Sequence, residues 1–351
     1  MEHPTLRLGL VGFGHAEAQR IGQWLARLTE GWPHWRLSAP DRADAWWIDG
    51  RCISKVEGDE LTVQTGLIEP PWIKLNPANV DRPIAFAGPL PSGMRALELV
   101  NPGDEAAVRQ QVQRFEGWLR PLRAQFALGA ELVERETEIK SGVYHLTLQG
   151  RLQAVVDLNH WRAALLASAR PVDFTQAMWE PRPDAASTPP GGFIRMSISQ
   201  LMWIYASRTR TNILPARYLS EKIYLRQVPR LPVGWLHDEH LLVLREVSAH
   251  ADTLDRLVRR TGLTTKRLSR LVAALYFSGA VTTSRGSAAK ARSHSDARAS
   301  ERAEHAADLA KGPVDAQNSD ILSSRLSGFG PNSHRLLSAS DLTAPAPLQD
   351  S

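Results

Sequence analysis

Cysteine and long apolar runs are almost missing from this chain of 351 residues. The single cysteine, Cys52, excludes an internal disulfide, a metal cluster held by several thiolates and a CxxC redox pair. The longest apolar runs, such as residues 8–13 and 271–277, are far too short to cross a bilayer. The first residues also lack the basic and then apolar pattern of a secretory signal. We therefore expect a cytoplasmic protein that does not contact a membrane.

Catalytic signatures are missing as well. The sequence has no HExxH zinc motif, no GxSxG nucleophile elbow and no GxxxxGK[ST] phosphate loop. His237 and His240 share a helical turn, but no further metal ligands accompany them in the sequence. We therefore expect a protein that is not an enzyme, with no catalytic residues, no metal ligands and no cofactor.

Tryptophan is absent after Trp235, although the chain contains eleven. From residue 284 onward, basic and acidic residues balance each other among Ser, Ala, Gly and Pro. Such a segment buries too little apolar surface to offset the entropy that is lost on ordering. We predict that residues 286–351 form a disordered tail that a protease removes first.

The positive charge of the chain is unevenly distributed. A net charge of +5 at pH 7 is compatible with a polyanionic partner but is too mild to demand one. Residues 191–235, however, hold seven Lys or Arg against one acid, Glu221. Aromatic residues are interleaved with these arginines, a mixture that pairs with phosphates and stacks on bases. The basic character is thus concentrated just before the C-terminal part of the folded chain.

Residues 236–283 predict three short helices followed by a strand. Gly262 ends the second helix, Thr264 caps the third, and Gly279 ends the third, because glycine adopts a left-handed stop cheaply and threonine caps helix starts. Two helices joined by a tight turn and followed by a β element are the plan of a helix-turn-helix with a small wing. We expect a winged-helix-like module over residues 236–285. The second strand of the wing should come from residues 284–287 or be absent.

The solvent side of the predicted third helix carries short polar and basic groups. Such side chains reach phosphates and base edges, so this helix is a candidate for DNA recognition. Winged helices also serve as docking platforms for proteins, and a solvated basic face is common on helices; both alternatives stay open. The residues predicted to bind DNA are Thr265, Lys266, Arg267, Ser269 and Arg270.

The N-terminus predicts the start of an α/β unit. Residues 6–11 form a buried-strand pattern that leads through Gly12-Phe13-Gly14 into a helical pattern over residues 16–28. A dinucleotide site at this turn is weakly supported, because Glu17 takes the place of the third glycine and would compete with a pyrophosphate. An enzyme that holds a nucleotide with Gly12 and Gly14 is nevertheless an alternative.

The next strands are predicted at residues 35–38, at residues 43–48 ending in Asp49, and at residues 83–86. This order loosely resembles a bacterial response-regulator receiver domain, and the resemblance implies a flavodoxin-like sheet over residues 1–125. The acidic pair and the lysine of receiver chemistry are missing around Gly12 to Gly14 and around residues 86–88. The resemblance therefore implies a pseudo-receiver, in which we expect Asp49 to be a turn or capping residue.

The region between these two parts predicts a small α+β module with a basic linker, over residues 140–235. Its clearest element is a β-hairpin over residues 144–156. We also expect a helix at residues 159–166, a strand at residues 172–179 and a flexible loop at residues 181–192.

Arg226 and Arg230 have the RxxxR spacing with which PilZ-type domains clamp cyclic dinucleotides. The Asp/Asn-x-Ser-x-x-Gly partner motif of those domains does not follow. The favoured interpretation is that these arginines lie on a linker that docks the C-terminal module. A phosphate or nucleotide contact is the alternative, and the resemblance would then imply an effector that responds to a cyclic dinucleotide.

These patterns predict a multidomain chain of the α/β and α+β classes, with a receiver-like sheet, an α+β middle and a winged-helix-like module. We expect a non-enzymatic protein of bacterial type that acts in signal transduction and transcription regulation by binding DNA. The alternative is a signalling adaptor that docks a protein partner through the same modules.

Overall fold

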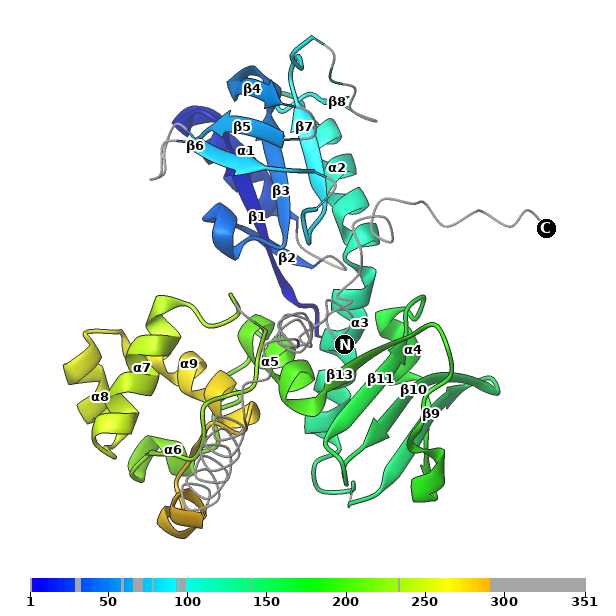
Figure 1. Cartoon of the computed structure of the whole chain (residues 1–351), viewed down its shortest axis with the longest axis vertical. Helices are drawn as coiled ribbons and strands as arrows, with labels where there is room; N and C mark the ends of the chain where they lie inside the picture. The colour runs from blue at the N-terminus through cyan, green and yellow to red at the C-terminus, as the bar shows by residue number, and fades with distance from the viewer. Residues whose placement is uncertain are drawn as a thin grey trace, which may run out of the picture.

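The computed structural model describes residues 2–28, 33–57, 60–65, 72–77, 79–92, 94, 99–139, 141–232 and 234–290. It is a mixed α/β chain with one parallel sheet and separate antiparallel sheets, which confirms the predicted fold class at that level. Figure 1 shows three units: a parallel-sheet unit at the top, an antiparallel-sheet unit below it on one side, and a C-terminal unit of short helices on the other. Within these described ranges, no helix is both long and apolar enough to cross a membrane.

The parallel-sheet unit is built on five strands in the order β2-β1-β3-β7-β8. Counted along the chain, this is the order 2-1-3-4-5 of one common type of open α/β sheet. The central strands read as nearly continuous apolar runs because both faces of the sheet are covered. The strands are β1 (Thr5–Val11), β2 (His34–Ser38), β3 (Ala45–Asp49), β7 (Ile84–Ala87) and β8 (Leu99–Val100).

Different elements cover the two faces of this sheet. Trp47 packs toward the helices α1 (His15–Arg27) and α2 (Glu105–Trp118). Its neighbours along β3, Trp46 and Ile48, pack toward a three-stranded antiparallel meander. A meander therefore lies where a doubly wound fold usually places helices. It consists of β4 (Ile53–Glu57), β5 (Glu60–Gln64) and β6 (Trp72–Leu75), and the 3-10 turns η1 (Pro40–Arg42) and η2 (Gly50–Cys52) flank β3.

The antiparallel-sheet unit has the strand order β12-β9-β10-β11-β13. The predicted hairpin is confirmed, and its turn residues Gln149 and Gly150 both have positive φ. Helices α3 and α5 pack on one face of the sheet. The elements are α3 (Arg120–Glu134), β9 (Val143–Leu148), β10 (Arg151–Asp157), β11 (Arg162–Leu166), α4 (Pro171–Thr175), β12 (Met178–Arg182), η3 (Asp184–Ser187), β13 (Phe193–Ser197) and α5 (Ile198–Arg208).

Two predictions for this unit are wrong. The expected helix at residues 159–166 is a turn and strand β11, because pairing with β10 and β13 overrides the helix preference of alanine and leucine. The expected strand at residues 172–179 begins as helix α4, which Asp173 starts by accepting a bond from the backbone N–H of Arg170 at 2.7 Å. The expected loop or linker at residues 181–192 is mostly loop, although it contains the end of β12 and the turn η3. It is held to the sheet by Ala186, whose carbonyl lies 2.9 Å from the His145 ring Nε2.

The two sheet units meet at Leu119, which ends α2 and precedes α3. The helical pattern over residues 105–135 is divided into two helices, with Pro121, the residue expected to kink or divide it, in the first turn of the second. Because α3 packs on the antiparallel sheet, that unit begins before the predicted residue 140.

Helices α3 and α5 cross closely at Gly129, and this contact makes a testable prediction. A Cβ atom at Gly129 would lie only 2.7 Å from the Cβ of Tyr205 and 3.5 Å from the carbonyl oxygen of Leu201. Gly129→Ala should therefore lower the free energy of unfolding by about 1–3 kcal/mol, because the helices must separate. Urea denaturation followed by tryptophan fluorescence measures the change.

Gly117 in α2 is the matched control, since a Cβ there would meet no heavy atom within 4 Å. Gly117→Ala should stabilise the chain by about 0.5–1 kcal/mol through helix propensity alone. Equal effects of the two alanine variants would show that the α3–α5 crossing tolerates a methyl group.

The C-terminal unit contains the three predicted helices and the predicted strand. The wing is different from the prediction, because Val281 and Thr282 pair with Leu225 and Tyr224, which precede the helices in the chain. The elements are α6 (Arg217–Ser220), β14 (Tyr224–Leu225), α7 (Asp238–Ala249), α8 (Leu254–Thr261), α9 (Thr265–Phe277) and β15 (Val281–Thr282).

The expected second wing strand at residues 284–287 is therefore not a strand. Residues 285–290 are helical, and Ala288 among them is fully buried. The start of the predicted disordered tail, residues 286–290, is thus helical and not disordered. The remainder of that tail, residues 291–351, lies outside the described residues.

Candidate nucleic-acid interface

The start of α9 is set by two local features that the sequence had indicated. Gly262 ends α8 with a φ of +70°, and its backbone N–H donates to the carbonyl oxygen of Val258 at 3.0 Å. The hydroxyl of Thr264 then accepts a hydrogen bond from the backbone N–H of Arg267 and caps α9. Because the first N–H groups of a helix carry a partial positive charge, this end of α9 favours anions.

Three of the five residues that were predicted to bind DNA are exposed: Thr265, Lys266 and Arg267. Ser269 is only 7% exposed, so its predicted place on the solvent side is wrong, and Arg270 is half-buried. The reason is that α9 packs against α5 as well as against α7 and α8, which leaves a broad exposed face only on its first turn.

Arg267 is held by an ion pair to helix α7. Its Nε donates to the Glu239 carboxylate at 2.8 Å, and both side chains keep part of their surface in solvent. Such a partly exposed pair positions the guanidinium without burying it. Lys266, next to it, is exposed and extends the basic surface of the turn.

Strands β1 and β2 of the parallel sheet bring further arginines to this region. Arg7 and Arg36 are register partners in these parallel strands. The guanidinium of Arg7 donates to the carbonyl oxygen of Ser207 at 3.3 Å, at the C-terminal end of α5. One residue on, Arg208 Nη2 lies 2.5 Å from Asp44 Oδ1, and both side chains are largely buried. These contacts attach the start of the parallel sheet to the helix on which α9 packs.

The arginines at this junction affect one another electrostatically. The pKa of Arg7 is lowered to about 10 by burial and then by the positive charge of Arg208, while Asp44 opposes both. The pKa of Arg36 is lowered by burial and then by the positive charges of Arg270, Arg267 and Arg210. We call these side chains the basic cluster: Arg7, Arg36, Arg210, Arg267 and Arg270.

Histidines beside the basic cluster are held neutral. His240 is buried, with its ring 4.7 Å from that of Trp203, and its Nδ1 accepts a bond from the backbone N–H of His237 at 3.2 Å. Burial, followed by the charges of His237 and Arg267, lowers the pKa of His240 to about 3. The pKa of His34 on β2 is also lowered, by burial and then by Arg210. The positive charge of the cluster therefore comes from arginine.

Arg7 and Arg36 were not predicted from the sequence as members of this site. The available signal was Arg7 itself, a charged residue inside the apolar pattern of the first strand, which must find a polar partner if it is buried. Nothing local to Arg36 indicates that it lies near α9. Arg208 and Arg210 belong to the basic stretch over residues 191–235, and the structure connects them with the start of the parallel-sheet unit.

Arg226 and Arg230, the RxxxR pair, are both exposed. The backbone N–H of Arg226 donates to the carbonyl oxygen of Ala280, beyond the far end of α9. Since a helix rises 1.5 Å per residue, about 15 Å of axis separates this point from Arg270. The structure therefore does not bring the RxxxR pair to the start of α9.

Asp49 ends β3 at the opposite, carboxyl end of the parallel sheet. Its Oδ1 accepts bonds from both the backbone N–H and the Nε of Arg51 at 3.0 Å, and the Arg51 guanidinium also contacts Glu17 at 3.2 Å. Asp49 caps η2, which confirms the predicted capping role. The bonds to Asp49 and Glu17 raise the pKa of Arg51. Glu17 also accepts a bond from the Gly14 backbone N–H, so this carboxylate takes the amide that a nucleotide phosphate would need.

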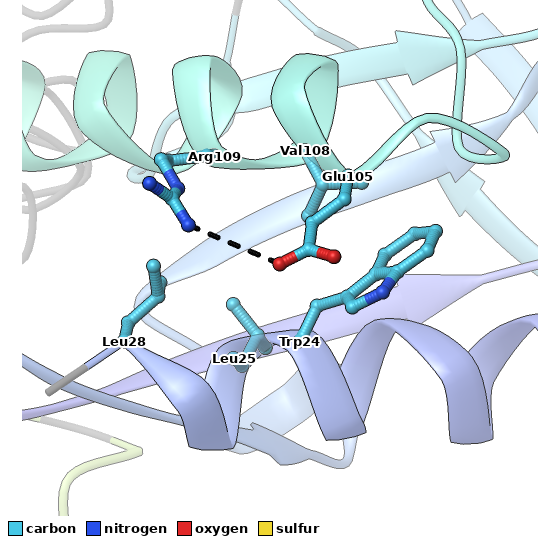
Figure 2. A pocket seen from close by; sticks show the side chains of 6 residues that line it. All are labelled: Trp24, Leu25, Leu28, Glu105, Val108 and Arg109. Carbon is cyan, nitrogen blue, oxygen red and sulfur yellow. Dashed lines mark ion pairs between the residues drawn. The ribbon is translucent and has the colours of Figure 1, made fainter.

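A small recess lies between α1 and α2 (Figure 2). Apolar side chains form most of its wall, and its charged groups, Glu105 and Arg109, pair with each other at 3.9 Å. Without convergent unpaired polar groups, it has the character of a packing gap between helices. The lining residues are Trp24, Leu25, Leu28, Glu105, Val108 and Arg109.

In the part of the chain that the structure describes, no group of three or more His, Cys, Asp or Glu side chains is arranged to hold a metal ion. The chain matches no protein-family model, no curated protein sequence and no solved structure. The basic cluster and the first turn of α9 are thus the strongest candidates for a functional site on geometric grounds.

Proposed function

We propose that this chain is a non-enzymatic regulatory protein that binds DNA with the first turn of α9. The observation that carries the proposal is the capped, exposed start of α9, where Thr265, Lys266 and Arg267 stand on a helix that follows a tight Gly262 turn. Helix-turn-helix proteins present the N-terminal residues of their second helix to base edges in the major groove. The β14–β15 ribbon supplies a short wing beside these helices.

The packing of α9 limits how it binds DNA. Because the helix is buried from Leu271 to Leu275, only its first turn and Arg270 are free to reach a duplex. We infer that Thr265 contacts base edges and that Lys266 and Arg267 contact phosphates, which supply most of the affinity.

In this proposal the parallel-sheet unit acts as a pseudo-receiver. The strand order supports a receiver-like topology, and Asp49 stands at the end of β3, where the resemblance places the phosphate acceptor. Arg51 occupies the Asp49 carboxylate, which disfavours phosphorylation there. DNA binding would then be regulated through contacts of the parallel-sheet unit with the other two units.

The test is DNA binding by a double variant, Lys266→Ala with Arg267→Ala. Losing two phosphate contacts should weaken affinity roughly tenfold or more and reduce the slope of log affinity against log salt by roughly 2. Fluorescence anisotropy with a labelled duplex, titrated at several salt concentrations, measures both quantities.

Arg151→Ala with Arg162→Ala is the control, because it removes the same charge from exposed positions on the antiparallel sheet. Its affinity should stay close to that of the unchanged protein. If the intact chain shows no DNA affinity at low salt, or if the two double variants lose affinity equally, the proposal fails.

Docking of a protein partner is the alternative function. It would need an exposed apolar face beside α9. The large apolar side chains exposed in this unit are Leu219 on α6, Val228 after β14 and Leu241 on α7, one from each segment. Single exposed apolar residues are ordinary on protein surfaces, so the basic first turn of α9 favours DNA.

A further inference from the structure

Arg36 lies within electrostatic range of two arginines from distant segments, Arg210 and Arg270, where the parallel sheet meets the C-terminal unit. Arg36 lies on β2, Arg210 follows α5 and Arg270 lies on α9. The side chains of Arg36 and Arg210 are exposed, and that of Arg270 is half-buried. Among the described residues, none of the three guanidinium groups forms an ion pair, whereas their neighbours Arg208 and Arg267 do.

The carboxylates at this junction are already engaged by other groups. Asp44 accepts bonds from Arg208 and from the backbone N–H of Arg7. Glu2 accepts bonds from the hydroxyl of Thr209 and the backbone N–H of Arg210, at 2.8 and 2.7 Å. Glu239 is the partner of Arg267. Within the described residues, these carboxylates are thus not available to the three arginines, and a bound anion would neutralise them.

Like charges held together without a counter-ion destabilise a folded chain, and partial burial increases the effect. The lowered pKa of Arg36 reports this repulsion, and its causes are burial and then the charges of Arg270, Arg267 and Arg210. Planar guanidinium groups match the oxygens of a phosphate in pairs. A group with two negative charges and several acceptor oxygens fits such a set better than a carboxylate.

We propose that Arg36, Arg210 and Arg270 together bind a phosphate group at the junction of the parallel sheet and α9. The phosphate belongs either to a small phosphorylated molecule or to a DNA strand, and its chemistry is the same in both cases. Bound there, it links β2 to α9 and so joins the parallel-sheet unit to the C-terminal unit. The site does not use Lys266 or the ion-paired Arg267, so it stands independently of DNA recognition by the first turn.

The test uses the full chain and inorganic pyrophosphate as the probe, at constant ionic strength. Saturating pyrophosphate should raise the Tm of the unchanged protein by about 2–4 °C, because it binds only the folded state. Arg36→Gln with Arg270→Gln should abolish this shift. Arg151→Gln with Arg162→Gln, which removes the same charge elsewhere on the surface, should keep it.

The Tm measured in chloride, without pyrophosphate, separates binding from a structural role. Because Arg36→Gln with Arg270→Gln removes repulsion, its Tm in chloride should equal or exceed that of the unchanged protein. A double variant that melts well below the unchanged protein in chloride, and still shows the full shift with pyrophosphate, overturns the proposal.

DNA binding by the same double variant identifies the source of the phosphate. If the double variant loses the pyrophosphate shift of the unchanged protein but keeps its DNA affinity, the phosphate belongs to a small phosphorylated molecule. If the unchanged protein shows no pyrophosphate shift and the double variant binds DNA about tenfold more weakly, the phosphate belongs to a DNA strand. If neither pyrophosphate nor DNA responds to the substitutions, the site does not exist. Failure of the Lys266→Ala with Arg267→Ala test alone leaves this proposal intact.

Discussion

Replacing Asp44 by alanine should lower the free energy of unfolding by about 3–5 kcal/mol, because the Arg208 guanidinium then stays buried without its counter-charge. The Asp44 side chain is 8% exposed and that of Arg208 is 12% exposed, and 2.5 Å separates their charged atoms. The same carboxylate also accepts the backbone N–H of Arg7 at 2.9 Å, which would lose its partner. Urea denaturation followed by tryptophan fluorescence measures the loss.

Two further variants make this prediction specific. Glu138→Ala breaks an exposed ion pair with Arg135 and should cost less than about 1 kcal/mol. Arg208→Met, added to Asp44→Ala, removes the buried charge and should restore part of the lost stability. An Asp44→Ala variant as stable as Glu138→Ala would mean that solvent reaches Arg208 and the pair does not hold the junction.

The second large effect is a loss of stability in mild acid caused by His240. Its pKa is about 3 in the folded chain and near 6.5 when unfolded. The unfolded state therefore takes up a proton first, so the contribution of His240 is complete above pH 6.5 and is lost as the pH falls toward 3. Between pH 6.5 and pH 5 the loss should be about 2 kcal/mol, from about 1.4 kcal/mol for each pH unit.

His240→Gln provides the comparison, because glutamine keeps an acceptor for the His237 backbone N–H but does not titrate. Denaturation midpoints measured from pH 7 to pH 5 should fall less steeply in this variant. Some slope will stay, since the pKa values of His34 and His237 are lowered too. If the denaturation midpoints of the unchanged protein and of His240→Gln fall equally with pH, His240 takes up a proton as readily in the folded state as in the unfolded state.

Elements with local signals could be predicted from the sequence. Helices α8 and α9 were found because Gly262 and Thr264 mark their ends, and the β9–β10 hairpin because Gln149 and Gly150 form its turn. Strand β11 was mistaken for a helix because its state depends on partner strands on both sides. The strand opposite β15 was sought nearby, whereas Tyr224 and Leu225 lie before all three helices.

The residues of the candidate site also differ in whether a local sequence signal or only a tertiary contact identifies them. Lys266 and Arg267 could be identified because a capped helix with a basic first turn is visible in one stretch of sequence. The burial of Ser269 could not be foreseen, because α5 was not known to cover that helix. Arg36 joins α9 only through the attachment of β1 to the end of α5, a tertiary contact that no local pattern encodes.

The pairing of β14 with β15 has a consequence for synthesis on the ribosome. Tyr224 is translated well before Val281 and Thr282, and at about 5–20 residues per second several seconds pass before its partner strand exists. The hydroxyl of Tyr218 donates a hydrogen bond to the carbonyl oxygen of Val281 at 3.3 Å, and this bond cannot form until Val281 has been synthesised. The C-terminal unit therefore cannot close during translation of its helices, and a nascent chain that stalls within α9 would expose the apolar surface of α6 and β14 to chaperones.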